Sequence, residues 1–469
     1  MRVGKNEIQK TSSQAVSCLV KIQRRWGRIT TGSGTAPTLT DPRKPIELKT
    51  GKLNSQLSGL EAIIIHRGVG ILLKLLMSEP VDFNLCVVIP ASGTGERMCL
   101  PSPKQFCTVL DKPLITYTLH TFNSIPCVEQ IIVTVSSQFI PLMRELIAEN
   151  GFSRVTVVEG ATTRHRSIYN GIKAIAKVCA QPDVVLIQDG VRVFADADFV
   201  KDIAVAAHKH GAAGVVRPLV STVIAADAEN FLEESLDRTK YRASEMPQAF
   251  RYEVIKSAYE KITDYDFDYG TECLHLALKY TGTMAYLLEG PNNLWKVTHK
   301  KDLYAVTGML KEHFLTVLLD GEVHHSLEET VTKSIQKKGM RVLPHSGPKT
   351  QLHSVTGLVC FHSDPSIQNI QCKTLELISS IRTVRNSTSV PISSIAVVHI
   401  FNSKTNISRP YGEFVNTVQA SAKMNKDVYT FCILYEPNGD YEDRLAEMTA
   451  SLLWERNPVF SGQVFYIND

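Results

Sequence analysis

The sequence contains no closely paired cysteines and no long uninterrupted hydrophobic run. Its ten cysteines are scattered along 469 residues without a Cys-x-x-Cys pair, which predicts neither a zinc site nor a disulfide framework. Free thiols in a reducing compartment are the simpler interpretation. The apolar stretch of residues 62–77 is interrupted by His66, Arg67 and Lys74, so it is too short and too charged to span a bilayer. These absences exclude a disulfide-rich fold and predict no membrane span.

Acidic residues are scarce in the N-terminal region. Residues 1–80 hold 13 Lys and Arg against 5 Asp and Glu, a net charge of +8, which leaves −4 for the remaining 389 residues. Because the basic excess belongs to this segment, we expect no nucleic-acid partner for the rest of the chain. We predict that residues 1–82 form a basic, disordered leader, and their Arg, Lys and Ser content leaves an organelle-targeting function open.

A glycine-containing loop follows a run typical of a buried strand. Residues 85–105 read Leu-Cys-Val-Val-Ile-Pro-Ala-Ser-Gly-Thr-Gly-Glu-Arg-Met-Cys-Leu-Pro-Ser-Pro-Lys-Gln. Gly93 and Gly95 would let the backbone approach a phosphate chain, which Arg97 and Lys104 would neutralise. The loop lacks the third glycine of a dinucleotide fingerprint and the Gly-Lys-Ser/Thr end of a P-loop. By itself, the pattern also fits a tight turn with solvated charges.

Short β-branched runs alternate with segments of helical spacing from residue 84 onward. We expect buried strands at 85–89, 130–135, 155–158 and 184–187. Apolar residues at helical spacing occupy 115–122, behind Pro113, and recur in 168–175. This alternation predicts a Rossmann-like α/β domain, residues 83–312, with a mostly parallel sheet covered on both faces. Its ligands would bind at the carboxyl ends of the strands.

A second α/β pattern begins near residue 313. Its expected strands are 315–319, 357–361, 395–401, 429–435 and 462–466. Ser326 and Glu329 have capping-box spacing and predict the start of a helix that Gly339 ends. Asp-Gly-Glu-Val follows the first expected strand in place of a glycine fingerprint. We therefore interpret residues 313–469 as a smaller Rossmann-like domain that serves as a scaffold or in dimerisation and binds no dinucleotide.

Further motifs follow the glycine-containing loop along the first domain. They are Glu-Gly-Ala-Thr-Thr-Arg-His-Arg-Ser (159–167), Val-Val-Leu-Ile-Gln-Asp-Gly-Val-Arg-Val-Phe (184–194), the stretch 217–248, Gly-Thr-Glu (270–272) and Leu-Trp-Lys-Val-Thr (294–298). Taken singly, residues 164–167 also fit a serine-capped helix N-terminus, and Asp189 with Gly190 fits a simple turn. Taken in order, the motifs of residues 84–312 resemble those of sugar-nucleotide and alditol-phosphate nucleotidyltransferases. The resemblance is strongest to the branch that contains methylerythritol-phosphate and ribitol-5-phosphate cytidylyltransferases.

This resemblance implies a nucleotide site. Its CTP-binding residues would be Ala91, Ser92, Gly93, Gly95, Gly160, Arg164, Ser167 and Asp189. Ser167 and the backbone near Gly160 would approach the cytosine, whereas Asp189 would hold the ribose hydroxyls or orient the metal-bound triphosphate. An aspartate directly after a buried strand is costly unless it is used. Gln188, Gly190 and Val193 replace the family's His, Ala and Pro, so we expect a less rigid loop here.

The resemblance also implies catalytic and substrate-binding residues. Arg97, Lys104 and Lys296 would stabilise the reacting phosphates, with Lys296 heading a short strand. The polyol phosphate would contact Arg192, Thr222, Arg238 and Thr271. In the resembling enzymes, the stretch that corresponds to residues 217–248 is an arm that completes the pocket of a second subunit, so a homodimer is implied.

The implied reaction is an in-line attack of a phosphate monoester on the α-phosphorus of CTP, with pyrophosphate leaving. The monoester is already anionic, so neither a general base nor a covalent intermediate is required. Catalysis would rest on positioning, cations and a Mg²⁺ carried mainly by the triphosphate.

Residues 242–250 and the second domain resemble the animal branch of the family. This resemblance implies CDP-ribitol as the product, dystroglycan O-mannosyl glycans as its destination and a cytosolic location. A methylerythritol-phosphate substrate and a catalytically dead scaffold are the alternatives.

Overall fold

The computed structural model describes most of the chain after residue 80. The described residues are 81–95, 98, 100–179, 181–270, 272–343, 349–362, 367–385, 391–402, 427–437 and 441–467. All but the last two residues of the predicted leader therefore lie outside the described part. Among the described residues, no helix is both long and apolar enough to cross a membrane.

The first large sheet occupies the predicted strand positions and extends beyond them. Its strands are β1 (Leu85–Pro90), β4 (Val128–Val135), β5 (Val155–Glu159), β6 (Val184–Ile187), β7 (Ala212–Pro218), β10 (Arg242–Arg251) and β11 (Tyr286–Glu289). Within the described residues they form one sheet in the order β11-β7-β10-β6-β1-β4-β5. The pairs are parallel except those made by β10, which confirms the mostly parallel sheet.

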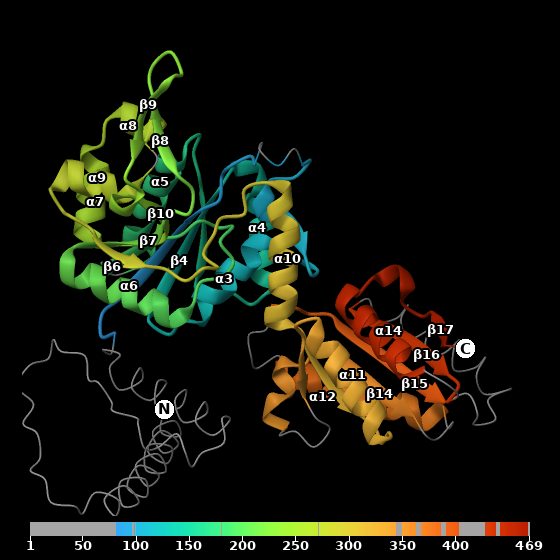
Figure 1. The fold of residues 1–469 in the computed structure, drawn as a ribbon. Coiled ribbons are helices and arrows are strands. Elements are labelled where there is room, and N and C mark those ends of the chain that lie inside the picture. The colour runs from blue at the N-terminus through green and yellow to red at the C-terminus, as the bar shows by residue number, and fades with distance from the viewer. Residues whose placement is uncertain are drawn as a thin grey trace, which may run out of the picture. The chain divides into compact units, whose positions relative to one another are not determined.

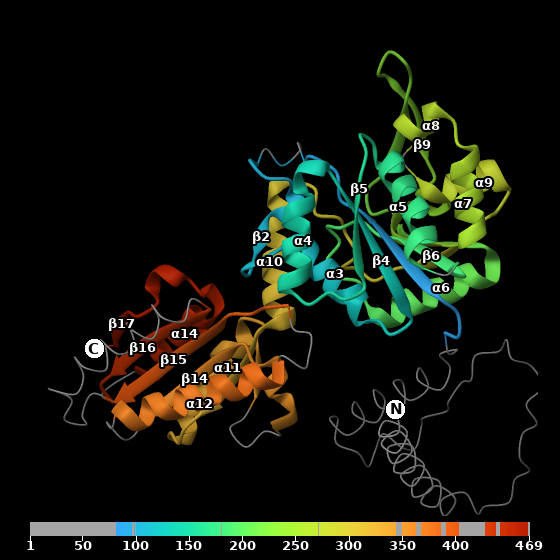
Figure 2. The same cartoon turned by 180° about the vertical axis from the view of Figure 1, so that it is seen from behind.

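Helices cover both faces of this sheet (Figures 1 and 2). They are α3 (Leu114–Ser124), α4 (Ile140–Glu149), α5 (Arg164–Val178), α6 (Ala197–His210), α7 (Tyr252–Lys261), α8 (Asp264–Tyr269) and α9 (Cys273–Thr281). The side chains of β1 alternate between two cores because successive residues of a strand point to opposite faces. Leu85, Val87 and Ile89 pack with α3, α4 and α6, whereas Cys86 and Val88 pack with α5, α7 and α9.

The chain order of the sheet creates an opening beside β1. From β1 the chain runs outward to β4 and β5, and it then returns through α5 to β6 on the other side of β1. The loops that follow β1 and β6 therefore diverge at the carboxyl ends of two neighbouring parallel strands. Such a switch point is where open α/β sheets bind their ligands.

A small antiparallel hairpin projects from this domain in both views (Figures 1 and 2). It consists of β8 (Val223–Ala226) and β9 (Leu232–Leu236), and it lies within the predicted arm. A second short pair is formed by β2 (Thr108–Val109) and β3 (Lys112–Pro113). The described 3-10 helices are η2 (Lys104–Phe106), η3 (Ser137–Phe139), η4 (Arg238–Lys240), η5 (Lys349–Ser354) and η6 (Pro458–Phe460).

The C-terminal region forms a second α/β domain after α10 (Lys300–Phe314). Its strands are β12 (Thr316–Asp320), β13 (Arg341–Leu343), β14 (Gly357–His362), β15 (Ile395–Asn402), β16 (Val428–Tyr435) and β17 (Val464–Ile467). In the described residues they form a parallel sheet in the order β13-β12-β14-β15-β16-β17. Helices α11 (His325–Lys337) and α14 (Tyr441–Glu455) pack on one face, and α12 (Ile367–Arg385) packs on the other.

The helix predicted after β12 is present, but its predicted capping box is wrong. Helix α11 begins at His325, and the backbone N–H of Ser326 donates to the side chain of the preceding His324. Ser326 Oγ instead donates to Glu442 of α14 at 2.8 Å, and Glu329 forms an ion pair with Lys333. Tertiary contact with α14 thus decides the role of the serine.

The short strand predicted at Lys296 is also wrong. Residues 291–299 are described and contain no strand. Leu294 and Val297 are buried, and the backbone N–H of Val297 donates to the carbonyl of Val191 at 3.2 Å. Buried side chains and single hydrogen bonds, rather than strand pairing, hold this segment.

Candidate active site

A cavity of about 330 Å³ opens at the carboxyl ends of β1 and β6. Residues 90–95 after β1, 161–164 before and at the start of α5, and 189–191 after β6 form much of its wall. Lys104 and Lys296 complete the wall from segments farther along the chain. The cavity therefore lies where the topology of the parallel sheet predicts a ligand.

Gln105 shapes the loop that follows β1. Its buried amide Nε2 donates to the carbonyl of Ala91 at 2.7 Å and to that of Gly93 at 2.9 Å. Gly95 adopts a φ of +76°, and a Cβ there would lie 3.0 Å from the backbone nitrogen of Lys104. Glycine is thus required at Gly95 both by the left-handed backbone and by the close approach. Gln105 was not among the predicted site residues, although it directly follows Lys104 in the motif.

Lys104 lines the cavity, as its predicted role requires. Its Nζ donates to the backbone carbonyl of Val297 at 3.1 Å, which joins the first loop to the segment that carries Lys296. Arg97, the other predicted cation of this loop, lies outside the described residues. The structure thus brings together two of the three predicted catalytic cations.

The second loop of the wall is packed directly against the first. A Cβ at Gly160 would lie 1.7 Å from Ser92 Oγ, so only glycine fits between the two loops. The one hydroxyl proton of Ser167 lies within reach of two carbonyls, that of Thr163 at 2.9 Å and that of Ala161 at 3.1 Å, and Oγ accepts from the backbone N–H of Ala161 at 2.9 Å. Ser167 therefore fixes the turn that enters α5, whose N-cap is Thr163 and not a serine.

Asp189 is the electrostatic centre of the site. It is 5% exposed, and its carboxylate lies 3.0 Å from Lys296 Nζ, 3.0 Å from Arg192 Nε and 3.5 Å from the guanidinium of Arg164. Burial alone would raise the pKa of Asp189, but Lys296, Arg164 and Arg192 together hold it well below its usual value. The carboxylate is therefore ionised and keeps these cations near the cavity.

Arg192 lies behind this carboxylate. It is buried, and its guanidinium contacts Asp189, Glu245 of β10 and the carbonyl of Leu294. It is absent from the described cavity wall, whereas Lys104, Arg164 and Lys296 belong to it. The described contacts make Arg192 a positioning group, and its predicted contact with substrate stays a prediction.

The loop after β6 is tied down despite its unusual residues. Gln188 Nε2 donates to the carbonyl of Arg192 at 3.2 Å, and Thr118 Oγ1 donates to the carbonyl of Gly190 at 3.2 Å. Residues 188–193 are all buried. Contacts with α3 and with Arg192 thus hold this loop, and the expectation of a less rigid loop stays a prediction.

The remaining predicted substrate residues lie elsewhere. Thr222 and Arg238 flank the β8–β9 hairpin, are exposed and do not line the described cavity of their own chain. Arg238 donates to the carbonyl of Val220 at 2.8 Å. Thr271 lies outside the described residues.

The charged side chains of the cavity suit a phosphate-bearing ligand that carries a Mg²⁺ ion. The described wall residues include one carboxylate, that of Asp189, and three cationic side chains, those of Lys104, Arg164 and Lys296. This excess of positive charge favours phosphate groups. Mg²⁺ is usually held by one or two carboxylates together with substrate phosphates and water, so Asp189 fits as its one protein ligand.

Comparison with known proteins finds that the chain is similar to cytidylyltransferases. Residues 85–312 match the family model described as 2-C-methyl-D-erythritol 4-phosphate cytidylyltransferase. The D-ribitol-5-phosphate cytidylyltransferase of Xenopus tropicalis is 39% identical over 414 residues, which cover 82% of this chain and 98% of the frog protein. The protein of the same name from Mus musculus is 46% identical over 278 residues, which cover 56% of this chain and 62% of the mouse protein.

A solved structure is also similar to part of this chain. It is the 4-diphosphocytidyl-2C-methyl-D-erythritol synthase of Anaerococcus prevotii, at 23% identity and a TM-score of 0.43. The match covers 49% of this chain and 96% of that one.

Proposed function

Because this chain belongs to the cytidylyltransferase family that includes the D-ribitol-5-phosphate cytidylyltransferases, we propose that it converts CTP and D-ribitol 5-phosphate to CDP-ribitol and pyrophosphate. The observation that carries this proposal is the cationic cavity at the carboxyl ends of β1 and β6, built around Asp189. A phosphate oxygen of ribitol 5-phosphate attacks the α-phosphorus of CTP, the bond to the β-phosphate bridging oxygen breaks, and pyrophosphate leaves.

The residues of the cavity act through position and charge. Two anions must meet, and negative charge grows on the phosphoryl oxygens during transfer, so preorganised cations lower the barrier. In our proposal Lys104 and Lys296 contact the reacting phosphates, and Asp189 keeps Lys296 and Arg164 in place before substrate binds. The backbone of residues 91–95 approaches the triphosphate, since Gly93 and Gly95 leave it uncovered.

A Mg²⁺ ion is proposed as the cofactor, with Asp189 as its protein ligand. When bound to the triphosphate, such an ion neutralises part of the phosphate charge. Asp189 already interacts with three cations, so its contribution to metal binding depends on how those ion pairs rearrange when CTP enters. The triphosphate itself would supply most of the ligands.

We further propose that the chain acts as a homodimer through the β8–β9 hairpin. The hairpin and its flanks expose apolar side chains, with Val220 87%, Phe231 67% and Leu232 67% exposed. Exposed apolar residues gathered on one projecting element favour burial against a partner. In such a dimer, Thr222 and Arg238 would reach the polyol phosphate in the partner's cavity.

The product and its place in the cell are the finer part of the proposal. CDP-ribitol would donate ribitol phosphate to the O-mannosyl glycans of dystroglycan. A cytosolic location is proposed because the described cysteines are free thiols, as expected in a reducing compartment.

The test is product formation with two polyol phosphates. Purified protein is incubated with CTP, Mg²⁺ and either D-ribitol 5-phosphate or 2-C-methyl-D-erythritol 4-phosphate, and the CDP-alditol is quantified by mass spectrometry. We expect a higher kcat/KM with ribitol 5-phosphate. A preference for methylerythritol phosphate would replace the proposed substrate, and no pyrophosphate release with either compound would favour a scaffold without activity.

A further inference from the structure

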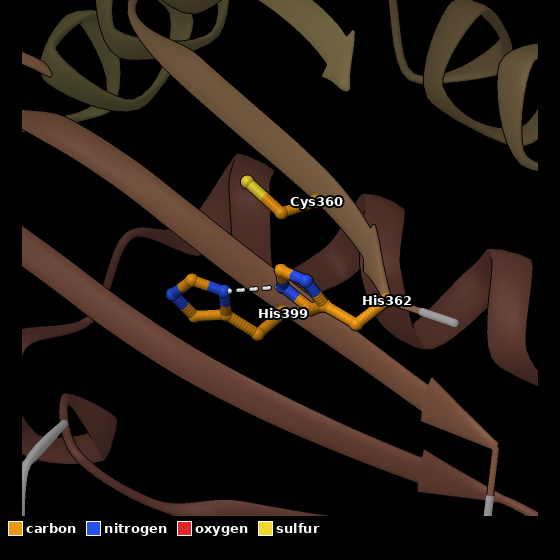
Figure 3. A group of neighbouring side chains, drawn as sticks. All are labelled: Cys360, His362 and His399. Atoms are coloured by element: carbon orange, nitrogen blue, oxygen red, sulfur yellow. Dashed lines mark hydrogen bonds between the residues drawn. The ribbon is translucent and has the colours of Figure 1, made fainter. Parts of the chain in front are cut away.

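Three side chains with metal-binding atoms meet in the C-terminal domain: Cys360, His362 and His399 (Figure 3). Cys360 and His362 are two residues apart on β14, so they share one face of the sheet. His399 of β15 is the direct cross-strand neighbour of Cys360. The sulfur and one nitrogen of each imidazole all lie within 4.8 Å of one another. We call these residues the Cys-His cluster.

The Cys-His cluster lies in an apolar core. Cys360 is 2% exposed and His399 is 3% exposed, and the same face of the sheet carries Leu358 and Val397 beneath α12. His362 is the last residue of β14 and is partly exposed. Burying a thiol and two imidazoles among apolar side chains carries a desolvation cost, which metal coordination would offset.

The two imidazoles come from neighbouring strands and meet through one nitrogen of each ring. Imidazole nitrogen is the commonest metal ligand in proteins. His362 Nε2 and His399 Nδ1 form a hydrogen bond of 2.9 Å, in which one ring donates and the other accepts (Figure 3). An ion bound between the rings would replace this hydrogen bond, with both nitrogens as ligands.

Neighbouring residues hold the rings and add charge of the right sign. The ring of Phe401 stacks on that of His362, with centroids 4.6 Å apart and planes inclined by 23°. Asp320 of β12 is the cross-strand neighbour of Cys360 on its other side. The carboxylate of Asp320 thus adds a negative charge next to the cluster, which favours a cation there.

The Cys-His cluster borders the place in the fold where a ligand is expected, because His362 ends β14 while Cys360 and His399 lie within β14 and β15. The chain leaves β12 toward β13, and it later continues from β14 toward β15 on the opposite side. The switch point of the second sheet therefore lies between β12 and β14, whose last residues are Asp320 and His362. Open α/β sheets bind ligands at the carboxyl ends of strands at such points.

We propose that Cys360, His362 and His399 bind one Zn²⁺ ion in the C-terminal domain. One sulfur and two imidazole nitrogens are soft and borderline donors that favour zinc over the oxygen-seeking Mg²⁺ and Ca²⁺. Zn–N bonds of about 2.0 Å and a Zn–S bond of about 2.3 Å place tetrahedral ligand atoms about 3.3 to 3.6 Å apart, which small side-chain rotations reach from the observed arrangement. Cys360 binds as the thiolate, and its proton passes to solvent.

Three protein ligands leave the fourth position of the ion to water or to a further small ligand. This arrangement is typical of zinc ions that bind or activate another molecule, whereas purely structural zinc sites use four protein ligands. The site lies on a different sheet from the cytidylyltransferase cavity, and the proposal is independent of the proposed function.

The experiment measures metal bound to the full chain without an affinity tag. Protein is stripped with a chelator, incubated with Zn²⁺, dialysed against metal-free buffer and analysed by elemental mass spectrometry. We expect one zinc per chain in the wild type, and loss of that zinc in both Cys360→Ser and His362→Gln. Cys372→Ser is the matched control because it removes an exposed thiol of α12, and it should retain the zinc.

Bound Co²⁺ shows directly whether a thiolate is a ligand. Co²⁺ bound in place of zinc should give a thiolate-to-metal charge-transfer band, which disappears in Cys360→Ser and persists in Cys372→Ser. Circular dichroism checks that each variant is folded, and His362→Gln is the milder change because its side chain is partly exposed. A wild type without bound zinc, or a cobalt band that survives in Cys360→Ser, would overturn the proposal. Pyrophosphate release, measured on the same samples, should be unchanged by Cys360→Ser.

Discussion

Gly160 and Ser92 join two loops of the cavity at a contact too close for any side chain. We expect Gly160→Ala to separate the loops, because its Cβ would lie 1.7 Å from Ser92 Oγ. Such overpacking costs about 1 to 3 kcal/mol of unfolding free energy. Chemical denaturation measures this loss, and titration with CTP should show weaker binding.

Gly93→Ala is the matched comparison for that variant. No atom lies within 4 Å of the Cβ position at Gly93, so the free energy of unfolding should barely change. CTP binding should still weaken, since the added methyl group would cover backbone that approaches the triphosphate. Equal stability losses in the two variants would contradict this account of the loops.

Lys104 should matter for turnover far more than for folding. Its Nζ makes a hydrogen bond to the carbonyl of Val297 and lines the cavity. We expect Lys104→Ala to lower kcat by about 10² to 10³, as the loss of other charge-stabilising donors does. Lys112→Ala is the control, because Lys112 lies outside the described cavity wall and its Nζ donates to Asn150 at 3.0 Å. Wild-type turnover in Lys104→Ala would refute the proposed catalytic role.

Asp189 links the stability of the protein to pH. Its pKa is lower in the folded protein than in the unfolded chain, so its ionised form stabilises the fold above about pH 4, and this contribution is lost as the pH falls through the lowered pKa. Asp189→Asn leaves Arg164, Arg192 and Lys296 facing one another without this charge. We expect a loss of about 3 to 5 kcal/mol at neutral pH.

The pH profile separates this explanation from a general packing defect. The stability difference between wild type and Asp189→Asn should stay constant between about pH 5 and pH 8 and shrink in stronger acid. Asp198→Asn is the control, because Asp198 is exposed and pairs with Lys201 at 3.5 Å on the surface of α6. That change should cost less than about 1 kcal/mol.

At the scale of elements, the β8–β9 hairpin is the proposed dimer contact. Phe231 is 67% exposed on this hairpin. We expect Phe231→Asp to convert a dimer to monomers in analytical ultracentrifugation and to lower turnover, since the proposed polyol pocket uses residues of both chains. Val459→Asp is the control, with a side chain 73% exposed outside the hairpin. A wild type that is monomeric at assay concentrations would rule out this role.

Helix starts show how tertiary contacts change a local pattern. Ser326 and Glu329 have capping-box spacing, yet α11 starts at His325 because His324 accepts the backbone hydrogen bond and Ser326 contacts Glu442. Local spacing located this helix correctly, but it could not identify the cap. The competing partner comes from α14, which is distant in sequence.

At the scale of the whole molecule, two sheets with separate cores predict separate responses to ligands. The cavity belongs to the first sheet, so CTP should stabilise only that domain. At about 100 times its Kd, CTP should add about 2.7 kcal/mol to the stability of that domain. Calorimetry should show two transitions, of which CTP raises the Tm of one. A single transition that shifts as a whole would show that the two domains unfold together.

The sequence by itself determined four strands of the first sheet, its mostly parallel pairing and the edge at which the cavity lies, whereas the order of the strands came from the structure. Buried runs such as Leu85–Ile89 and Val184–Ile187 can be recognised locally, and the rule that ligands bind at carboxyl ends then locates the loops. The motif resemblance supplied Lys104, Gly160, Ser167 and Asp189, all of which lie in or beside the cavity.

Only the tertiary structure decided which of these residues touch. It made Arg192 a buried support for Asp189, gave Gln105 its role in the first loop, and tied down the loop after β6. It also brought His399 beside Cys360 and His362, although His399 lies 37 residues after His362 in the chain. The spacing of the cysteines along the chain had predicted no zinc site. Local spacing cannot report such contacts, because strand pairing in a parallel sheet joins residues that are far apart in sequence.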